Sequence, residues 1–184
     1  MELAADPSTG VVHDGGMVLV VRRAAVEDWA VLRSLRLRAL EVDSDAFGST
    51  LDHELAQPEV FWRERISQDA WFLAWANGQA IGTAAAVAAA SGASAERQLD
   101  AMWVDPAYRG RGIANALTDA VCAWAKSQGA TSLSLTVIDG NETARRLYLR
   151  LGFRPTGERE PRPRNPAQIR ERLRLRLLPT AAGS

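Results

Sequence analysis

The chain of 184 residues has one cysteine, Cys122, and two histidines. A single cysteine cannot form an internal disulfide, which favours a reducing, cytoplasmic compartment. No apolar run reaches the roughly 18 residues that a membrane-spanning helix needs, and the N-terminal residues lack the basic and apolar layout of a signal peptide. The composition therefore predicts a cytoplasmic protein that does not interact with a membrane.

Net charge is also lacking, because 22 basic residues balance 22 acidic ones. Without an overall positive charge or a dominant basic patch, nucleic-acid binding is disfavoured. The length suits one domain with a substantial core. We predict a single domain over residues 17–179, with flexible tails at 1–16 and 180–184, and no metal ion.

The periodicity of apolar residues predicts eleven structural elements along the chain. An Asn77-Gly78 pair between two apolar runs indicates a hairpin, and alternation of Arg with Leu near the C-terminus indicates a last strand with one buried face. The order is strand, two helices, three strands, helix, strand, helix and two strands, which is typical of an α+β or α/β sheet protein. The clearest elements are a strand at 18–23, helices at 26–40 and 58–68, strands at 70–75 and 80–90, a strand ending at 104, a helix from 113 to 128, a strand at 132–138, a helix at 141–151, an extended piece from 153 to 156 before a proline-rich loop, and a strand at 170–178.

The turn after Pro106 is the most informative stretch. Pro106 ends the strand before it, because proline has no hydrogen-bond donor for the sheet. Gly110 and Gly112 allow positive φ and leave the backbone open to a ligand. An amphipathic helix follows at once, so unpaired N–H groups and the positive end of a helix dipole point to one spot. Such a spot binds a phosphate or pyrophosphate.

Two common phosphate-binding patterns do not fit this turn. No Lys-Ser or Lys-Thr follows the glycines, which excludes a P-loop, and only two glycines match the three of the dinucleotide fingerprint. What remains is Arg109-x-x-Gly112-x-Ala114, which resembles the Arg/Gln-x-x-Gly-x-Gly/Ala signature of the GNAT family of N-acetyltransferases. In that family the loop holds the pyrophosphate of acetyl-coenzyme A (acetyl-CoA). A plain glycine-bearing turn is the alternative interpretation.

Three further stretches carry the same resemblance, which covers the chain from about Val18 to Leu178. They are Asn141-x-x-Ala-x-x-Leu-Tyr148-x-x-x-Gly-Phe, Met102-x-Val-x-Pro106, and Arg36-x-x-Ala-Leu with Ala46-Phe-Gly-Ser. The resemblance implies an α+β three-layer fold, with a mixed, mostly antiparallel sheet of about seven strands flanked by about four helices. It also implies that the central strands ending at Val104 and Ile138 splay apart.

Acetyl-CoA is the co-substrate that the resemblance implies. We expect its pyrophosphate to be held by backbone N–H groups from Arg109 to Ala114, namely those of Arg109, Gly110, Arg111, Gly112, Ile113 and Ala114, with added contacts from the two arginine side chains. The resemblance further implies that the backbone of Met102, Trp103 and Val104 pairs with the pantetheine arm and that Asn141 reaches the cofactor. Asn141 also suits a simple helix N-cap.

Tyr148 is the implied general acid, which would protonate the coenzyme A sulfur. The competing interpretation is a core tyrosine with a satisfied hydroxyl. Asp100 is the candidate general base, although a surface carboxylate fits the position as well, and Glu96 and His53 are weaker candidates. Cys122 has no neighbouring base in the sequence, which disfavours an acyl-cysteine route.

The resemblance thus predicts an N-acetyltransferase that passes the acetyl group of acetyl-CoA to a primary amine in a ternary complex. The alternative is a non-catalytic acyl-CoA-binding or sensor module on the same fold. A cationic amine would meet Asp43, Asp45 or Glu54, unless these carboxylates only keep the loop soluble. The family also allows a homodimer, and the sequence leaves the identity of the amine open.

Overall fold

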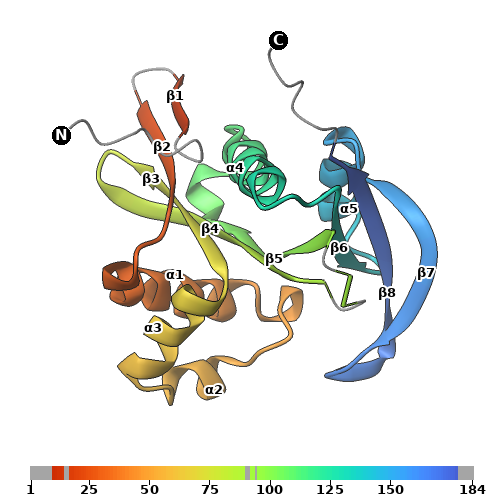
Figure 1. Ribbon diagram of the computed structural model, residues 1–184. Coiled ribbons are helices and arrows are strands. Elements are labelled where there is room, and N and C mark those ends of the chain that lie inside the picture. Colours follow the sequence, from red (N-terminus) through yellow and green to blue (C-terminus); the bar gives the residue numbers. More distant parts are fainter. Residues whose placement is uncertain (1–9, 15–16, 90–91, 94, 178–184) are drawn as a thin grey trace, which may run out of the picture.

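The computed structural model describes residues 10–14, 17–89, 92–93 and 95–177. Its centre is one eight-stranded sheet, in the order β1-β2-β3-β4-β5-β6-β8-β7 (Figure 1). Neighbouring strands are antiparallel except for β5 and β6. The strands are β1 (Gly10–Asp14), β2 (Met17–Arg23), β3 (Ala70–Ala76), β4 (Gln79–Ala88), β5 (Glu96–Val104), β6 (Ser132–Ile138), β7 (Arg154–Arg162) and β8 (Asn165–Arg176).

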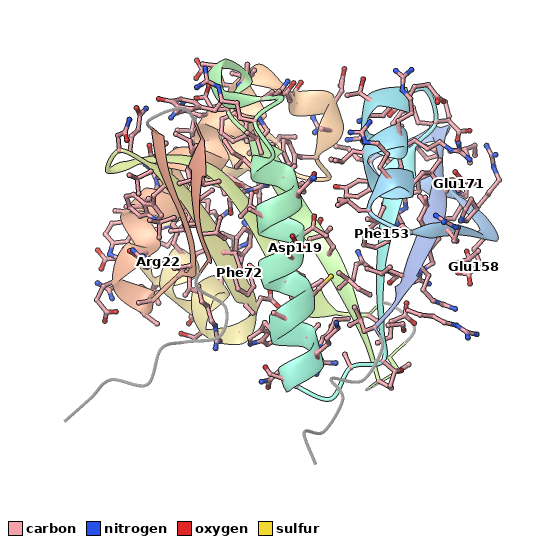
Figure 2. The ribbon with its side chains drawn as sticks, turned by 90° about the horizontal axis from the view of Figure 1, so that it is seen from above. Arg22, Phe72, Asp119, Phe153, Glu158 and Glu171 are labelled. Carbon is pink, nitrogen blue, oxygen red and sulfur yellow. The ribbon has the colours of Figure 1, made fainter. Side chains whose placement is uncertain are left out.

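Helices cover both faces of the sheet, so the predicted three-layer α+β fold is confirmed. The helices of residues 29–68 lie below the sheet in Figure 1, and the helix of residues 113–127 lies above it. Figure 2 looks onto the second face and shows α4 crossing its middle, with Asp119 on it, and α5 beside it. The helices are α1 (Trp29–Val42), α2 (Leu51–Leu55), α3 (Glu59–Gln68), α4 (Ile113–Ser127) and α5 (Glu142–Arg150). None of the helices in the described residues is long and apolar enough to cross a membrane.

Two strand predictions at the sheet edges need correction. The sequence assigns residues 1–16 to a tail, but Gly10–Asp14 form β1 and pair with β2; residues 1–9, 15–16 and 180–184 of the predicted tails lie outside the described residues. The sequence also predicts a proline-rich loop after Thr156, yet β7 runs through Pro155 and Pro161. Its register with β8 shifts after each of these prolines. A strand at a sheet edge tolerates proline, since one side of it needs no ladder donor.

Two apolar clusters hold the layers together. The first lies under α4 and α5 and includes Phe72, Leu117 and Phe153. The second lies under α1 and α3 and includes Leu35 and Trp62. The strands β3 and β4 contribute alternate residues to each cluster, as the pleat of a sheet requires. The central strands therefore sit buried between two helical layers.

One charged group is buried against the sequence-based expectation. The heptad-like spacing of α1 predicts Arg36 off the apolar face, but its side chain is only 2% exposed. It forms a bidentate pair with Glu54 of α2, with Nη2–Oε1 at 2.8 Å and Nε–Oε2 at 3.3 Å. Arg65 of α3 lies 3.4 Å from the same carboxylate. The pair ties all three lower helices together.

Strand β5 carries a bulge and separates from β6 toward its C-terminal end. The β4–β5 register shifts between Thr83 and Ala85, and Ala101 has a positive φ of 52°, a strained conformation for a residue with a Cβ. The parallel pairing of β5 with β6 spans only Glu96–Gln98. Beyond it the two strands separate, which confirms the predicted splay.

Candidate active site

A cleft of about 810 Å³ lies between the end of β5, the N-terminus of α4, and α5. It brings together three stretches of the sequence, within residues 43–46, 102–115 and 141–150. Most of the predicted cofactor-binding residues line it: Met102, Trp103, Val104, Arg109, Gly110, Gly112, Ile113, Ala114, Asn141 and Tyr148. Arg111 does not line it, and its guanidinium instead lies 5.8 Å from the centre of the Tyr108 ring.

The N-terminus of α4 presents open main-chain donors to the cleft. The helix begins its hydrogen bonding with Ala116 N–H to the Gly112 carbonyl, at 3.0 Å, so the N–H groups of residues 113–115 have no acceptor in the helix. Gly112 is the N-cap with φ 75° and offers no side-chain cap. A Cβ placed on Gly110 or Gly112 would meet nothing within 4 Å. This end of the helix can therefore accept an anion directly against the backbone.

Arg109 has a different place from the one that the sequence predicts. Its own N–H donates to the Pro106 carbonyl at 3.3 Å, so the open donors begin at Gly110. Its guanidinium Nε donates to the Val104 carbonyl at 2.9 Å, and Nη2 pairs with Asp43. The side chain thus fixes the turn to the end of β5 and to the α1–α2 loop.

The free edge of β5 faces the gap left by β6. Asp105 N–H donates to the Ile81 carbonyl at 2.8 Å, and Trp103 pairs with Thr83, so both direct their main-chain groups toward β4. Main-chain groups of successive residues in a strand point to opposite edges. Val104 therefore turns its N–H group toward the gap, where an extended ligand arm can pair with it.

Tyr148 lies at the inner end of the cleft. Its ring is buried and makes an edge contact with Phe153, with ring centres 5.6 Å apart. Its hydroxyl donates no hydrogen bond to any residue that the structure describes, although it comes from the cleft wall. Burial raises the pKa of Tyr148 above its ordinary value, and the charge of Asp100 raises it further. The hydroxyl is therefore protonated at neutral pH, and its proton is not used in a hydrogen bond to the described part of the chain.

Asn141 caps α5 and also borders the cleft. Its Oδ1 accepts the Ala144 N–H at 3.1 Å, which confirms the N-cap interpretation. Because Oδ1 faces that donor, the amide NH₂ is the group left for a ligand. The cap and a contact with a ligand are therefore compatible.

None of the three predicted proton acceptors lines the cleft. Asp100 is exposed, and its Oδ1 accepts the N–H of Ala101 at 2.8 Å, which stabilises the bulge. Glu96 is buried and pairs with Arg174 at 3.5 Å. His53 is on α2, with its ring nitrogen 3.4 Å from Gln57. The structure thus gives no support to a direct carboxylate or imidazole base at these positions.

Cys122 is not suited to act as a nucleophile. Burial raises the pKa of Cys122 to about 11, with a further contribution from the charge of Asp119. A thiol with that pKa is protonated at neutral pH and is a poor nucleophile. This agrees with the expectation that no acyl-cysteine forms.

Several cleft residues escaped the sequence-based prediction. Arg146 and Arg150 lie on α5, at the edge of the cleft. The guanidinium of Arg150 has no partner among the described residues, while Arg146 Nε donates to the Glu142 carbonyl at 3.2 Å. The spacing of Thr143, Arg146 and Arg150 places them on one helical stripe, and that signal could have revealed them.

Asp43, one of the three carboxylates that the sequence suggests for attracting an amine, lines the cofactor cleft. Its Oδ2 accepts a hydrogen bond from Trp103 Nε1 at 2.8 Å as well as the contact from Arg109. It also lines a second cavity, of about 450 Å³, which continues from the cleft between the α1–α2 loop and the end of β6. Asp45 lines this second cavity. Glu54 does not, since it is buried in the ion pair with Arg36, so its predicted part in attracting an amine is wrong.

Comparison with known proteins agrees with this geometry. The family model described as the acetyltransferase (GNAT) family matches residues 29–153. A curated relative, N-acetyltransferase 8F1 of Rattus norvegicus, is 34% identical over 91 residues, which are 48% of this chain and 41% of that protein. The match thus spans less than half the length of that relative.

Solved structures share the fold over almost the whole chain. The acetyltransferase yncA of Salmonella typhimurium, solved with its cofactor acetyl-CoA, has a TM-score of 0.69 at 20% identity, with 90% of this chain and 98% of that chain covered. An acetyltransferase of the GNAT family from Streptococcus pneumoniae has a TM-score of 0.73 at 20% identity, with 87% and 99% covered. Because the family model spans well over half of the sequence, this protein belongs to the GNAT acetyltransferase family.

Proposed function

We propose that the protein transfers the acetyl group of acetyl-CoA to a primary amine, by direct attack of the amine within a ternary complex. The observation that carries the proposal is the single cleft in which the open donors of α4, the unpaired edge of β5 and the Tyr148 hydroxyl meet. Each feature suits one part of the reaction. The family membership and the acetyl-CoA-bound structural relative support the choice of co-substrate.

The residues of the cleft fit acetyl-CoA from end to end. The N–H groups from Gly110 to Ala114 suit its pyrophosphate, since they combine open donors with a helix dipole. The main chain of Met102 and Val104 suits its pantetheine arm. The N–H of Val104 would polarise the thioester carbonyl, as a backbone donor does in an oxyanion hole.

Tyr148 is the proposed general acid. In the transfer one C–S bond breaks and one C–N bond forms, while the amine loses a proton and the departing sulfur gains one. The Tyr148 hydroxyl makes no hydrogen bond to the described residues, and its raised pKa keeps it protonated at neutral pH, so the proton is available to the sulfur. Since neither Asp100 nor Glu96 lines the cleft, we propose that the amine passes its proton to water.

Release of free coenzyme A tests the function. We expect purified protein mixed with acetyl-CoA to release coenzyme A only when a suitable primary amine is added, and to form the N-acetyl product in equal amount. Calorimetry with acetyl-CoA is the companion measurement. Binding of acetyl-CoA without turnover of any amine in a broad panel would favour the non-catalytic sensor module instead.

The arginines of α5 supply a separate prediction about the cofactor. We expect Arg150→Gln to weaken acetyl-CoA binding by about tenfold, since hydrogen bonds to charged groups contribute about 1.5–3 kcal/mol. If Arg150 meets the 3′-phosphate, acetyl-3′-dephospho-CoA should bind the variant and the unmodified protein equally well. Calorimetry with both ligands measures this difference.

Arg145→Gln is the matched control for that measurement. Arg145 is also on α5, but its Nε pairs with Glu171 Oε2 at 3.0 Å and it does not line the cleft. Its replacement should leave the dissociation constant of acetyl-CoA within about twofold, since the pair is partly exposed. Equal affinity of the Arg150→Gln variant and the unmodified protein for acetyl-CoA would contradict a phosphate contact.

A further inference from the structure

The second cavity has the composition of a substrate site. It continues from the cofactor cleft, because Asp43, Ala46 and Asn141 line both. Its walls come from the α1–α2 loop, from the end of β6 and from Gln168 at the start of β8. If the proposed function holds, an amine in this cavity lies beside the acetyl group. The charges and hydrogen-bonding groups of its lining residues then indicate which amine fits.

Among the described residues, one carboxylate that lines the second cavity has no ion-pair partner. The charged lining residues of this cavity are Asp43, Asp45 and Asp139. Asp43 is paired with Arg109, and Asp139 is paired with Arg159 of β7. Asp45 has neither an ion-pair partner nor a hydrogen-bond partner within the part of the chain that the structure describes. The second cavity can therefore neutralise the charge of one ammonium group.

Gln168 offers the cavity a donor and no acceptor. Its Oε1 accepts from Nη1 of Arg162 at 2.7 Å, and a guanidinium can only donate, so the oxygen must be the atom that faces Arg162. The Nε2 of Gln168 is left without an acceptor among the described residues. Arg162 is itself buried and also donates to the Phe47 carbonyl, so this orientation is fixed from behind.

Asn141 also offers a donor to the second cavity. Its Oδ1 is occupied by the Ala144 N–H at 3.1 Å, so its amide also turns NH₂ outward at the border of the two cavities. Two NH₂ groups and one unpaired carboxylate therefore frame the space. Together they match a ligand that carries one ammonium group and an oxygen that accepts hydrogen bonds.

We propose that the second cavity is the acceptor site, and that its acceptor is an α-amine next to a neutral carbonyl, as in an amino acid amide or a peptide N-terminus. Asp45 pairs with the ammonium group, and Gln168 donates to the carbonyl oxygen. Polyamines fit poorly, because their second ammonium group finds no free carboxylate. Free amino acids fit less well than their amides, because their carboxylate stands near Asp45.

A set of small amines tests the proposal through coenzyme A release. The probes are alanine amide, dialanine amide, alanine, sec-butylamine, which lacks the carbonyl, and putrescine, which has two ammonium groups. We expect kcat/KM for alanine amide to exceed that for sec-butylamine and for putrescine by about tenfold or more. The kcat/KM for alanine should lie between the value for alanine amide and the values for sec-butylamine and putrescine. A higher value for dialanine amide than for alanine amide would identify a peptide N-terminus as the source.

Two variants separate the site from the intrinsic reactivity of each amine. Asp45→Asn should raise KM for alanine amide about tenfold and leave kcat and the dissociation constant of acetyl-CoA unchanged. Gln168→Glu keeps an acceptor for Arg162 but removes the NH₂ donor from the cavity. It should therefore lower kcat/KM for alanine amide and leave kcat/KM for sec-butylamine, which has no carbonyl, unchanged, a selective effect that loss of folding cannot produce.

Asp52→Asn is the matched control, because Asp52 is an exposed carboxylate on α2 that lines neither cavity. Its kinetics should equal those of the unmodified protein. Equal kcat/KM for alanine amide, sec-butylamine and putrescine, or an Asp45→Asn variant without effect, would overturn the acceptor assignment while the transferase function stands. Binding of acetyl-CoA without turnover of any probe or any other primary amine would overturn both.

Discussion

Replacement of Tyr148 by phenylalanine is expected to lower kcat by about a hundredfold or more, which is the usual contribution of a positioned general acid. The ring of Tyr148 packs against Phe153 and would stay in place, because only the oxygen is removed. That oxygen donates no hydrogen bond to the described residues, so its loss leaves no protein group unpaired. Acetyl-CoA affinity and melting temperature should therefore change little.

The second tyrosine of the chain provides the control. The Tyr108 hydroxyl donates to Gln79 Oε1 at 3.4 Å, so it already has an acceptor in the protein. Tyr108→Phe removes the same group from a partly exposed position, so kcat should fall by less than about threefold. Steady-state kinetics with saturating acetyl-CoA and a primary amine measures both variants. An unchanged kcat for Tyr148→Phe would exclude the general-acid role.

The pH dependence gives an independent check on Tyr148. A general acid works while it is protonated, so its contribution is lost as pH rises through its pKa in the folded protein. Burial and the nearby charge of Asp100 raise that pKa above the ordinary value of 10.0. We therefore expect no alkaline decline of kcat between pH 7 and pH 9.5. Over the same interval kcat/KM should rise, as more of the amine loses its proton.

The motifs that local geometry fixes could be predicted from the sequence. Gly112 at the mouth of α4 and Asn141 at the head of α5 act through their own backbone neighbours, within three or four residues. Periodicity was sufficient for the helices that bury one face, because α1 and α4 each show it over about four turns. The family resemblance then placed these elements around one cleft.

The rest of the site depends on contacts across long stretches of sequence. Asp43 meets Trp103 and Arg109, which follow 60 and 66 residues later, and no local pattern announces such a pairing. Arg162 fixes Gln168 but also reaches the Phe47 carbonyl, 115 residues away. Arg36 looked exposed because the helical pattern shows its charge and not its partner. The acceptor side of the protein is built almost entirely from such contacts, which is why the sequence left the amine open.

The buried pair of Arg36 and Glu54 carries the largest stability prediction. Their side chains are 3% and 1% exposed, and Arg65 adds a second cation to the same carboxylate. Glu54→Gln would leave the buried Arg36 guanidinium and the partly buried Arg65 guanidinium without their counter-charge. Removal of one partner of a buried pair costs about 3–5 kcal/mol, which for a domain of this size corresponds to a loss of roughly 6–20 °C in Tm. Calorimetric or denaturant unfolding at pH 7 measures it.

Acid should remove the difference in stability between the unmodified protein and the Glu54→Gln variant, because the pKa of Glu54 is lowered in the folded protein. Burial alone would raise that pKa, but the hydrogen bond from Arg36 and the charges of Arg36 and Arg65 bring it below the ordinary value of 4.5. A carboxylate with a lowered pKa stabilises the fold above its unfolded-state pKa and loses that contribution as pH falls through its folded-state pKa. The difference in the free energy of unfolding between the unmodified protein and the Glu54→Gln variant should therefore become smaller below about pH 4.

A surface pair on α3 separates the effect of burial from that of charge. Glu59 accepts from Arg63 at 2.6 Å, one helical turn away, with side chains that are 50% and 39% exposed. Glu59→Gln should cost no more than about 0.5 kcal/mol, because solvent screens an exposed pair. Equal losses for Glu54→Gln and Glu59→Gln would show that burial adds nothing. A large loss confined to Glu54 would show that the desolvated ion pair, which joins α1, α2 and α3, stabilises the fold.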